Sequence, residues 1–171
     1  MVRYVISSSE STVWIDARSS LHPVHSESAG LVGYFEGLIL PEGGLDPSTE
    51  PRAHLELPIE NLSSGNPLYD REMKRRVDVR RHPKIMADVV EMREVGSGHR
   101  YLVSGDITFR GTTRRVRDEV SMTDLGQGRL TFDGHHVFDI RDFGMEPPRV
   151  MMLKVYPEVA VRVHIVAEAT P

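Results

Sequence analysis

The sequence has 171 residues, of which 39% are hydrophobic, and its formal net charge at pH 7 is −4. A chain of this size can form one domain with a substantial core, and its nearly balanced charge gives no reason to expect a nucleic-acid partner. Because the sequence contains no cysteine, disulfide bonds, thiolate metal sites and a cysteine nucleophile are excluded.

The N-terminal segment does not have the features of a targeting sequence. It lacks the apolar stretch of a secretory signal, and no part of the chain approaches the roughly 18 consecutive apolar residues of a membrane-spanning helix. We therefore expect a soluble, cytoplasmic protein. The polar, serine-rich segment 7–12 predicts a flexible lead-in over residues 1–11, followed by a single domain over residues 12–169.

Strand patterns begin at residues 13–18 and continue in the run 31–40. In that run Gly33, Phe35 and Gly37 share one face, because side chains alternate between the two faces of a strand. Glycines among large apolar residues indicate a tight bend, close backbone packing or space kept for a ligand. Residues 53–60 alternate as a further strand, with Leu55 and Leu57 on the apolar face.

Residues 68–79 are the best candidate for a helix. Asn66 can cap it and Pro67 can occupy its first position, while Pro83 prevents its continuation. A narrow apolar stripe is predicted at Leu68, Met73 and Val77. The clusters of Lys and Arg at 74–76 and 80–81 have carboxylates beside them, and we expect them to form a solvated face rather than a phosphate site.

The strand from Tyr101 to Phe109 has the clearest alternation in the chain, and it follows an earlier strand that contains Ala87. Gly111 marks a turn, and a second alternating run begins at Val116, so these residues predict an antiparallel hairpin. The face that we expect to be buried carries the following residues: Tyr101, Val103, Gly105, Ile107 and Phe109.

Two further strands complete the predicted set. In the first, Phe132, Gly134, His136 and Phe138 share a face, and the second covers residues 159–165. The chain therefore contains about eight strands and one helix, with turn signals at short intervals and no alternation of strands with helices. This pattern favours an all-β sandwich or barrel over a parallel α/β fold.

Several short segments, taken in order, resemble the YceI-like family of polyisoprenoid-binding, lipocalin-like proteins. They are Trp14-Ile-Asp, Ser20-Leu, His25, Gly33-Tyr-Phe-Glu-Gly-Leu-Ile, Asp70, Pro83-Lys-Ile, Gly105-Asp-Ile-Thr-Phe-Arg-Gly-Thr-Thr and Asp139-Ile-Arg-Asp-Phe-Gly-Met. The resemblance implies an elongated, hollow, eight-stranded antiparallel barrel with a short helical insertion. It also implies a bound isoprenoid, such as a polyprenyl lipid or a quinone tail, and a possible homodimer. It implies no set of catalytic residues.

A barrel of eight strands is just wide enough to be filled by its own side chains or to hold one small ligand. Small residues among aliphatic and aromatic ones on the inward face favour a narrow, dry tunnel. We predict that the following residues line it: Gly33, Phe35, Gly37, Leu55, Leu57, Ala87, Tyr101, Val103, Gly105, Ile107, Phe109, Phe132, Gly134 and Phe138.

Two polar residues, Asp118 and His136, interrupt the predicted inward face on neighbouring strands. They could form a satisfied buried pair, a β-bulge could turn Asp118 outward, or they could anchor the polar head group of a ligand. His25 could line the pocket or make a structural hydrogen bond. A metal site at His22 and His25 is disfavoured because no third ligand lies near in sequence, so we expect no metal and no cofactor beyond the bound lipid.

The sequence leaves three functions open: a barrel that carries or sequesters an isoprenoid lipid, an enzyme that uses His136 and Asp118 on a lipid-like substrate, or a ligand-free stress-response protein with a filled barrel. A hydrophobic small molecule is the expected partner. Arg115 and Arg117 are predicted to face outward, where they could contact a pyrophosphate or, transiently, a membrane surface, or could serve solubility alone.

Overall fold

The computed structural model describes residues 1–150 and 152–171. Its helical elements are α1 (Pro67–Val77) and two short 3-10 helices, η1 (Ile59–Asn61) and η2 (Ile140–Phe143). Its strands are β1 (Val2–Ile6), β2 (Thr12–Ser19), β3 (Val24–Ser28), β4 (Val32–Gly37), β5 (Arg52–Pro58), β6 (Lys84–Glu94), β7 (Arg100–Phe109), β8 (Thr112–Gly126), β9 (Arg129–Asp139), β10 (Arg149–Val150) and β11 (Leu153–Ala169).

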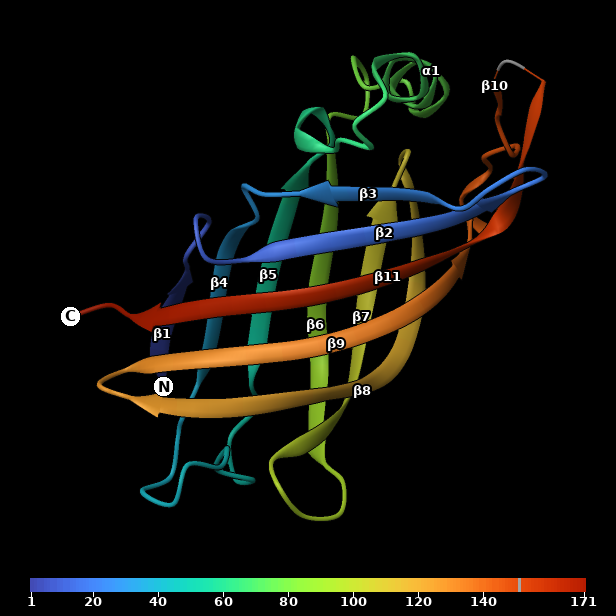
Figure 1. Ribbon diagram of the computed structural model, residues 1–171. Coiled ribbons are helices and arrows are strands. Elements are labelled where there is room, and N and C mark those ends of the chain that lie inside the picture. Colours follow the sequence, from blue (N-terminus) through green and yellow to red (C-terminus); the bar gives the residue numbers. More distant parts are fainter. Residues whose placement is uncertain (151) are drawn as a thin grey trace.

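The predicted eight-stranded antiparallel barrel is confirmed (Figure 1). Its strands follow one another in the order β1-β4-β5-β6-β7-β8-β9-β11, and β11 closes the circle by pairing with β1. The long strand β11 also pairs with β2 over part of its length, and β3 extends the sheet beyond β2. The barrel therefore has a continuous wall at one end and an additional two-stranded flap at the other.

Strand β1 lies within the segment that the sequence predicts as a flexible lead-in, so the prediction that the barrel begins at residue 12 is corrected. Tyr4 and Ile6 are buried, and Tyr4 pairs with Phe35 on one side and with Ala169 on the other. Ser11 is also buried, and its hydroxyl accepts a hydrogen bond from the backbone N–H of Val166. The alternation in residues 2–6 covers only five positions, which is too short to stand out beside the serines that follow it.

The hairpin formed by β7 and β8 has the predicted turn. Arg110 and Gly111 are its two central residues, with φ angles of 51° and 73°. Two left-handed residues in succession characterise the tight turn whose twist matches that of the flanking strands. The register from Arg100 to Phe109 is regular, so every second residue of this hairpin points into the barrel.

Helix α1 lies across one end of the barrel (Figure 1). Asn66 caps it as predicted, since its side chain accepts hydrogen bonds from the backbone N–H groups of Leu68 and Tyr69. The predicted apolar stripe is partly wrong, because Leu68 is 49% exposed. The stripe that faces the barrel is Tyr69, Met73 and Val77, whose spacing of four residues keeps them on one side of a helix.

Two groups of packed side chains occupy the ends of the barrel. At the end remote from α1, Phe35 packs on Phe132 with ring centroids 4.9 Å apart, and the loop that contains Leu45 covers them. Beneath α1, a smaller cluster includes Ile59 and Val77. The two clusters leave the middle of the barrel unfilled.

Candidate functional site

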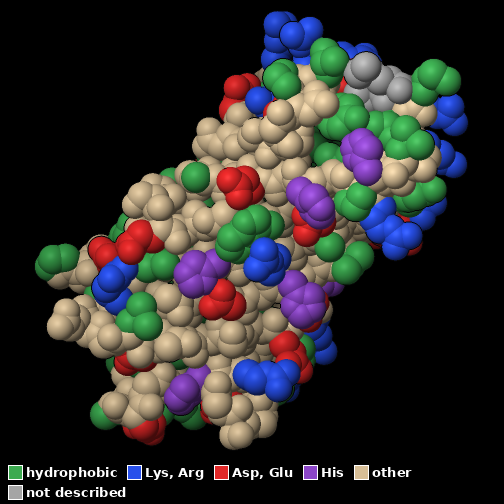
Figure 2. Space-filling view, in the orientation of Figure 1, with side chains coloured by type: hydrophobic (Ala, Val, Ile, Leu, Met, Phe, Trp, Pro, Cys, Tyr) green, Lys and Arg blue, Asp and Glu red, His purple; other side chains and the backbone are tan. Residues whose placement is uncertain are grey.

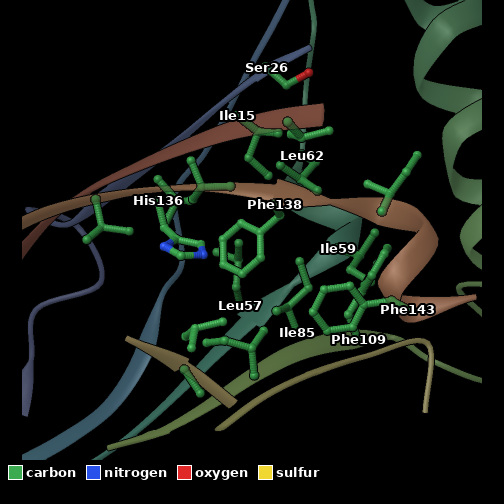
Figure 3. Close-up of a pocket in the computed structure, with 18 of the residues that line it drawn as sticks. Ile15, Ser26, Leu57, Ile59, Leu62, Ile85, Phe109, His136, Phe138 and Phe143 are labelled. Carbon is green, nitrogen blue, oxygen red and sulfur yellow. The ribbon is translucent and has the colours of Figure 1, made fainter. Parts of the chain in front are cut away.

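The middle of the barrel contains a cavity of about 370 Å³ (Figure 3). On β7 its wall extends from Val103 to Phe109, which is six steps of about 3.4 Å or roughly 20 Å of strand. Nearly all lining side chains are aliphatic or aromatic. The cavity reaches the surface below α1, where Val24, Tyr69 and Met73 line it and are partly exposed. It is therefore a long, dry pocket with one end accessible.

Many inward residues around the cavity are partly exposed rather than buried. On β6, for example, Ile85, Ala87 and Val89 are of intermediate exposure, although they alternate with the outward and exposed Asp88 and Val90. In a barrel filled by its own side chains the inward positions would be buried. The exposure pattern thus identifies a hollow region and contradicts a fully filled barrel.

Nine of the predicted lining residues face this cavity, and five do not. Those that line it are Leu55, Leu57, Ala87, Val103, Gly105, Ile107, Phe109, Gly134 and Phe138. The other five do not line it: Phe35, Gly37, Tyr101 and Phe132 pack at or near the remote end of the barrel, and Gly33 lies against the backbone of β5 beside Leu55. The side chains of Phe35, Tyr101 and Phe132 point into the barrel, as the alternation predicts, but they lie beyond the cavity along the barrel axis.

The inward glycines do not keep space for a ligand. A Cβ at Gly33 would lie 2.0 Å from the backbone oxygen of His54, and one at Gly37 would lie 2.7 Å from the ring of Phe35. At Gly105, a Cβ would lie 3.0 Å from a backbone oxygen of β6. These glycines allow close approach of neighbouring strands or of an aromatic ring, so the hollow space arises from where the large side chains are placed.

Several lining residues were not predicted. Ile15 and Ser26 enter from β2 and β3, and Tyr69 and Met73 enter from α1. The only signal for the helical pair in the sequence is the spacing of Tyr69, Met73 and Val77.

One polar pair, Asp118 and His136, lies on the apolar wall (Figure 3 shows the imidazole). The pair faces across β8 and β9, and the Nδ1 of His136 lies 2.8 Å from the Oδ2 of Asp118. The register of β8 is regular through residue 118, so no bulge turns the carboxylate outward. The structure thus shows a hydrogen-bonded pair directed into the barrel.

The hydrogen bond between the two side chains determines which nitrogen of His136 acts as the donor. Burial raises the pKa of the Asp118 carboxyl, but hydrogen bonds from His136 and from the backbone N–H of Glu119 more than offset it, and the pKa is lowered overall. Because the carboxylate is ionised and can only accept, the Nδ1 of His136 donates to it. The other nitrogen, Nε2, then accepts a hydrogen bond in the neutral imidazole and donates one in the imidazolium. The ring also packs edge-on against Phe138 at 4.6 Å between centroids.

His25 does not lie at the cavity, which corrects one of its two predicted roles. Its side chain is 72% exposed, and its Nδ1 lies 2.6 Å from Asp16 on the neighbouring strand. Two further His–Asp pairs lie on the outer surface of the barrel, His54 with Asp88 and His164 with Asp133. Among these cross-strand pairs, only His136 with Asp118 faces inward.

Two further observations concern the chemistry that this structure can support. Within residues 1–150 and 152–171, no group of three or more His, Asp or Glu side chains is arranged to hold a metal ion. In the same residues, none of the helices is long and apolar enough to cross a membrane.

Comparison with known proteins finds solved structures that share the fold of the whole barrel. Among solved structures, this chain is similar to BcnA of Burkholderia cenocepacia (17% identity, TM-score 0.78, covering 94% of this chain and 98% of that one). It is also similar to a polyisoprenoid binding domain of Saccharophagus degradans implicated in plant cell wall breakdown (14%, 0.79, covering 99% and 100%). A YceI protein of Campylobacter jejuni matches at 9% identity and a TM-score of 0.69, with 86% of each chain covered.

Among curated proteins, no sequence matches this chain. The solved structures share the fold at low sequence identity, and the family assignment rests on a separate comparison. The sequence model of the YceI-like domain matches residues 4–167, which include all or most of every strand of the closed barrel. This chain therefore belongs to the YceI-like family.

Proposed function

We propose that this protein binds an isoprenoid-type amphipathic lipid, a polyprenyl chain or a quinone tail, in the barrel cavity, and that it carries or sequesters this lipid. The observation that carries the proposal is the cavity itself, which is long, narrow, almost entirely apolar and accessible at one end. The relative from Saccharophagus degradans, which has the same fold, is described as a polyisoprenoid binding domain.

The energetics of an apolar wall favour a long chain over a small molecule. Each buried methylene-sized group contributes roughly 0.8 kcal/mol, whereas association itself costs on the order of 4–15 kcal/mol. A ligand with about ten buried carbons would gain only about 8 kcal/mol, which is comparable with that cost. Tight binding therefore requires several isoprene units, which the depth of the cavity favours.

We further propose that His136 anchors the polar group of the ligand. Its Nε2 has no hydrogen-bond partner within the described residues, while Nδ1 is held by Asp118. With a neutral imidazole the anchor would accept a hydrogen bond from a hydroxyl, and with an imidazolium it would donate one to a quinone carbonyl. A polar group beside the apolar wall would otherwise remain without a partner at a cost of about 1–3 kcal/mol.

The first test is native mass spectrometry of protein purified without detergent, followed by organic extraction and identification of the released molecule. A stoichiometric isoprenoid is the expected result. If the protein has the mass of the bare chain and takes up neither polyprenyl lipids nor quinones, the proposal fails.

The anchor has a test with a matched control. His136→Leu removes the inward imidazole, and His164→Leu removes an imidazole that makes the same kind of cross-strand pair on the outer surface. We expect the first variant to retain less of a ligand that carries a hydroxyl or a carbonyl, and the second to retain it normally. Equal retention by both variants would reject the anchor while leaving the lipid-binding proposal intact.

The same pair supports a second candidate, an enzyme that acts on a lipid-like substrate. A carboxylate that orients an imidazole is a common acid–base arrangement, and this one borders the cavity. Incubation of the protein with its extracted ligand, followed by mass spectrometry, distinguishes the two. A chemically unchanged ligand favours the carrier, and a product that His136→Leu does not form favours the enzyme.

A further inference from the structure

The end of the barrel that carries α1 differs sharply in charge from the rest of the chain. We call it the portal end and define it as segments 18–23, 59–84, 110–115 and 139–154. It contains 14 of the 21 Lys and Arg residues but only seven of the 25 Asp and Glu residues, a net charge of +7. The remaining residues have a net charge of −11. A protein of overall charge −4 is thus strongly polarised along its barrel.

Direct contacts join these segments into one surface. The hydroxyl of Tyr69 in α1 lies 3.5 Å from the imidazole of His22 in the β2–β3 turn. The backbone N–H of Lys154 donates to the hydroxyl of Ser20 in the same turn. The hairpin tip is tied in by Arg110, whose guanidinium donates to the backbone oxygen of Gly144. The basic residues of the portal end therefore act together around the mouth of the cavity.

Much of this positive charge is not neutralised locally. Within the described part of the chain, six exposed basic side chains of the portal end take part in no ion pair: Arg18, Arg71, Arg80, Arg114, Arg149 and Lys154. By contrast, Glu72 pairs with two arginines, and Asp78 and Asp139 each face one. Figure 2 shows blue side chains along the upper and right edges of the molecule, over α1 and beside β10.

Large apolar side chains project from the same surface. Leu21 in the β2–β3 turn is 79% exposed, Leu68 in the first turn of α1 is 49% exposed, and Met152 between β10 and β11 is 99% exposed. Each stands on a different element that borders the mouth of the cavity. Exposed apolar side chains surrounded by basic ones are typical of proteins that bind at the surface of a bilayer, since either feature alone gives weak attachment.

We propose that the portal end docks on anionic phospholipid membranes. Leu21, Leu68 and Met152 would enter the interface, and the basic residues around them would contact lipid phosphates. In this orientation the mouth of the cavity faces the bilayer and the negatively charged remainder faces water. The docking surface lies on different residues from the cavity wall, so it goes beyond the proposed cargo and does not depend on its identity.

The test measures binding of the purified chain to sedimented vesicles of phosphatidylcholine with phosphatidylglycerol, and to vesicles of phosphatidylcholine alone. We expect binding to the anionic vesicles that weakens as salt is added, and little binding to the neutral ones. The double variant Arg71→Gln/Lys154→Gln should bind roughly 30-fold more weakly. The control Arg52→Gln/Arg93→Gln removes the same charge at the opposite end and should change binding less than about threefold.

The apolar contribution is tested in the same way. Leu21→Ser/Met152→Ser should weaken binding by roughly tenfold or more, whereas Leu125→Ser, at the β8–β9 turn, should have little effect. Equal binding to both kinds of vesicle, or equal loss in portal and control variants, would overturn the proposal. Binding to polyadenylate as strong as that to vesicles and unaffected by Leu21→Ser/Met152→Ser would assign the basic end to nucleic acid instead. Because these vesicles contain no isoprenoid, failure here leaves the lipid-binding proposal standing.

Discussion

Replacing Ala87 with phenylalanine would place an aromatic ring in the cavity. Ala87 lies on β6 between Leu55 and Ile107, which also line the cavity. A ring of six carbons displaces about as many ligand carbons, each worth roughly 0.8 kcal/mol, so ligand binding should weaken by roughly 5 kcal/mol, or more than a thousandfold in Kd. The same ring fills empty space, so the ligand-free protein should become more stable by about 2 kcal/mol, which corresponds to roughly 5 °C in Tm.

The two effects have opposite signs, which makes the experiment decisive. Ligand uptake is followed by native mass spectrometry and stability by thermal unfolding, both after extraction of any bound lipid. Ala160→Phe is the control, because Ala160 is exposed on the outer face of β11 and should change neither quantity much. If Ala87→Phe instead lowers the stability by about 1–3 kcal/mol, side chains already fill this region and the hollow barrel is refuted.

Three smaller predictions concern the frame of the barrel. The imidazole of His54 donates hydrogen bonds to Asp88 and to Glu56, and these bonds, the one to Asp88 first, raise its pKa. Their contribution to the free energy of unfolding, on the order of 1 kcal/mol, is therefore fully present below the ordinary pKa of 6.5 and is lost as the pH rises through the raised value. Denaturant unfolding of His54→Gln should show a difference from the unchanged protein that shrinks towards alkaline pH, and a constant difference would contradict this. Gly33→Ala should destabilise the protein by more than about 2 kcal/mol in the same assay, because its Cβ would meet the backbone of β5. The control Gly65→Ala has no atom within 4 Å of the new Cβ and should cost about 1 kcal/mol. Similar losses of stability for both variants would refute the close approach of β4 and β5 at Gly33. Asn66→Ala removes the cap of α1 and should lower the free energy of unfolding by about 1 kcal/mol. It should also accelerate hydrogen exchange of the backbone amides in this helix. Unchanged exchange would contradict a stabilising role of the cap.

The sequence predicts which way each strand residue points much better than how far along the barrel it lies. Alternation alone directs Asp118 and His136 inward, and the structure agrees. Phe35 and Phe132 also point inward as predicted, yet they pack at the closed end instead of lining the cavity. Axial position depends on the stagger between strands around a closed barrel, which is a property of all eight strands together and is not encoded in any one of them.

The remaining differences have local causes. Strand β1 is only five residues long, and its pattern is obscured by the polar segment that follows. The predicted stripe of α1 has one wrong position, because the apolar Leu68 is a more obvious choice than Tyr69, although the aromatic ring faces the barrel and the leucine does not. The surface around Leu21 and Met152 could not be predicted, since it brings together turns that are far apart in the sequence.

The pairing of β11 constrains how this protein can fold during synthesis. Tyr4 pairs with Ala169, so the barrel is sealed by contacts between segments near opposite ends of the sequence. Such long-range contacts are formed slowly, and β11 also provides the partner for β2 and β9. Until β11 has left the ribosome, β1, β2 and β9 present unpaired edges that could join to other chains, and the future cavity is an open apolar trough. A nascent chain therefore has no enclosed pocket to offer, and any cargo must enter after translation has reached β11.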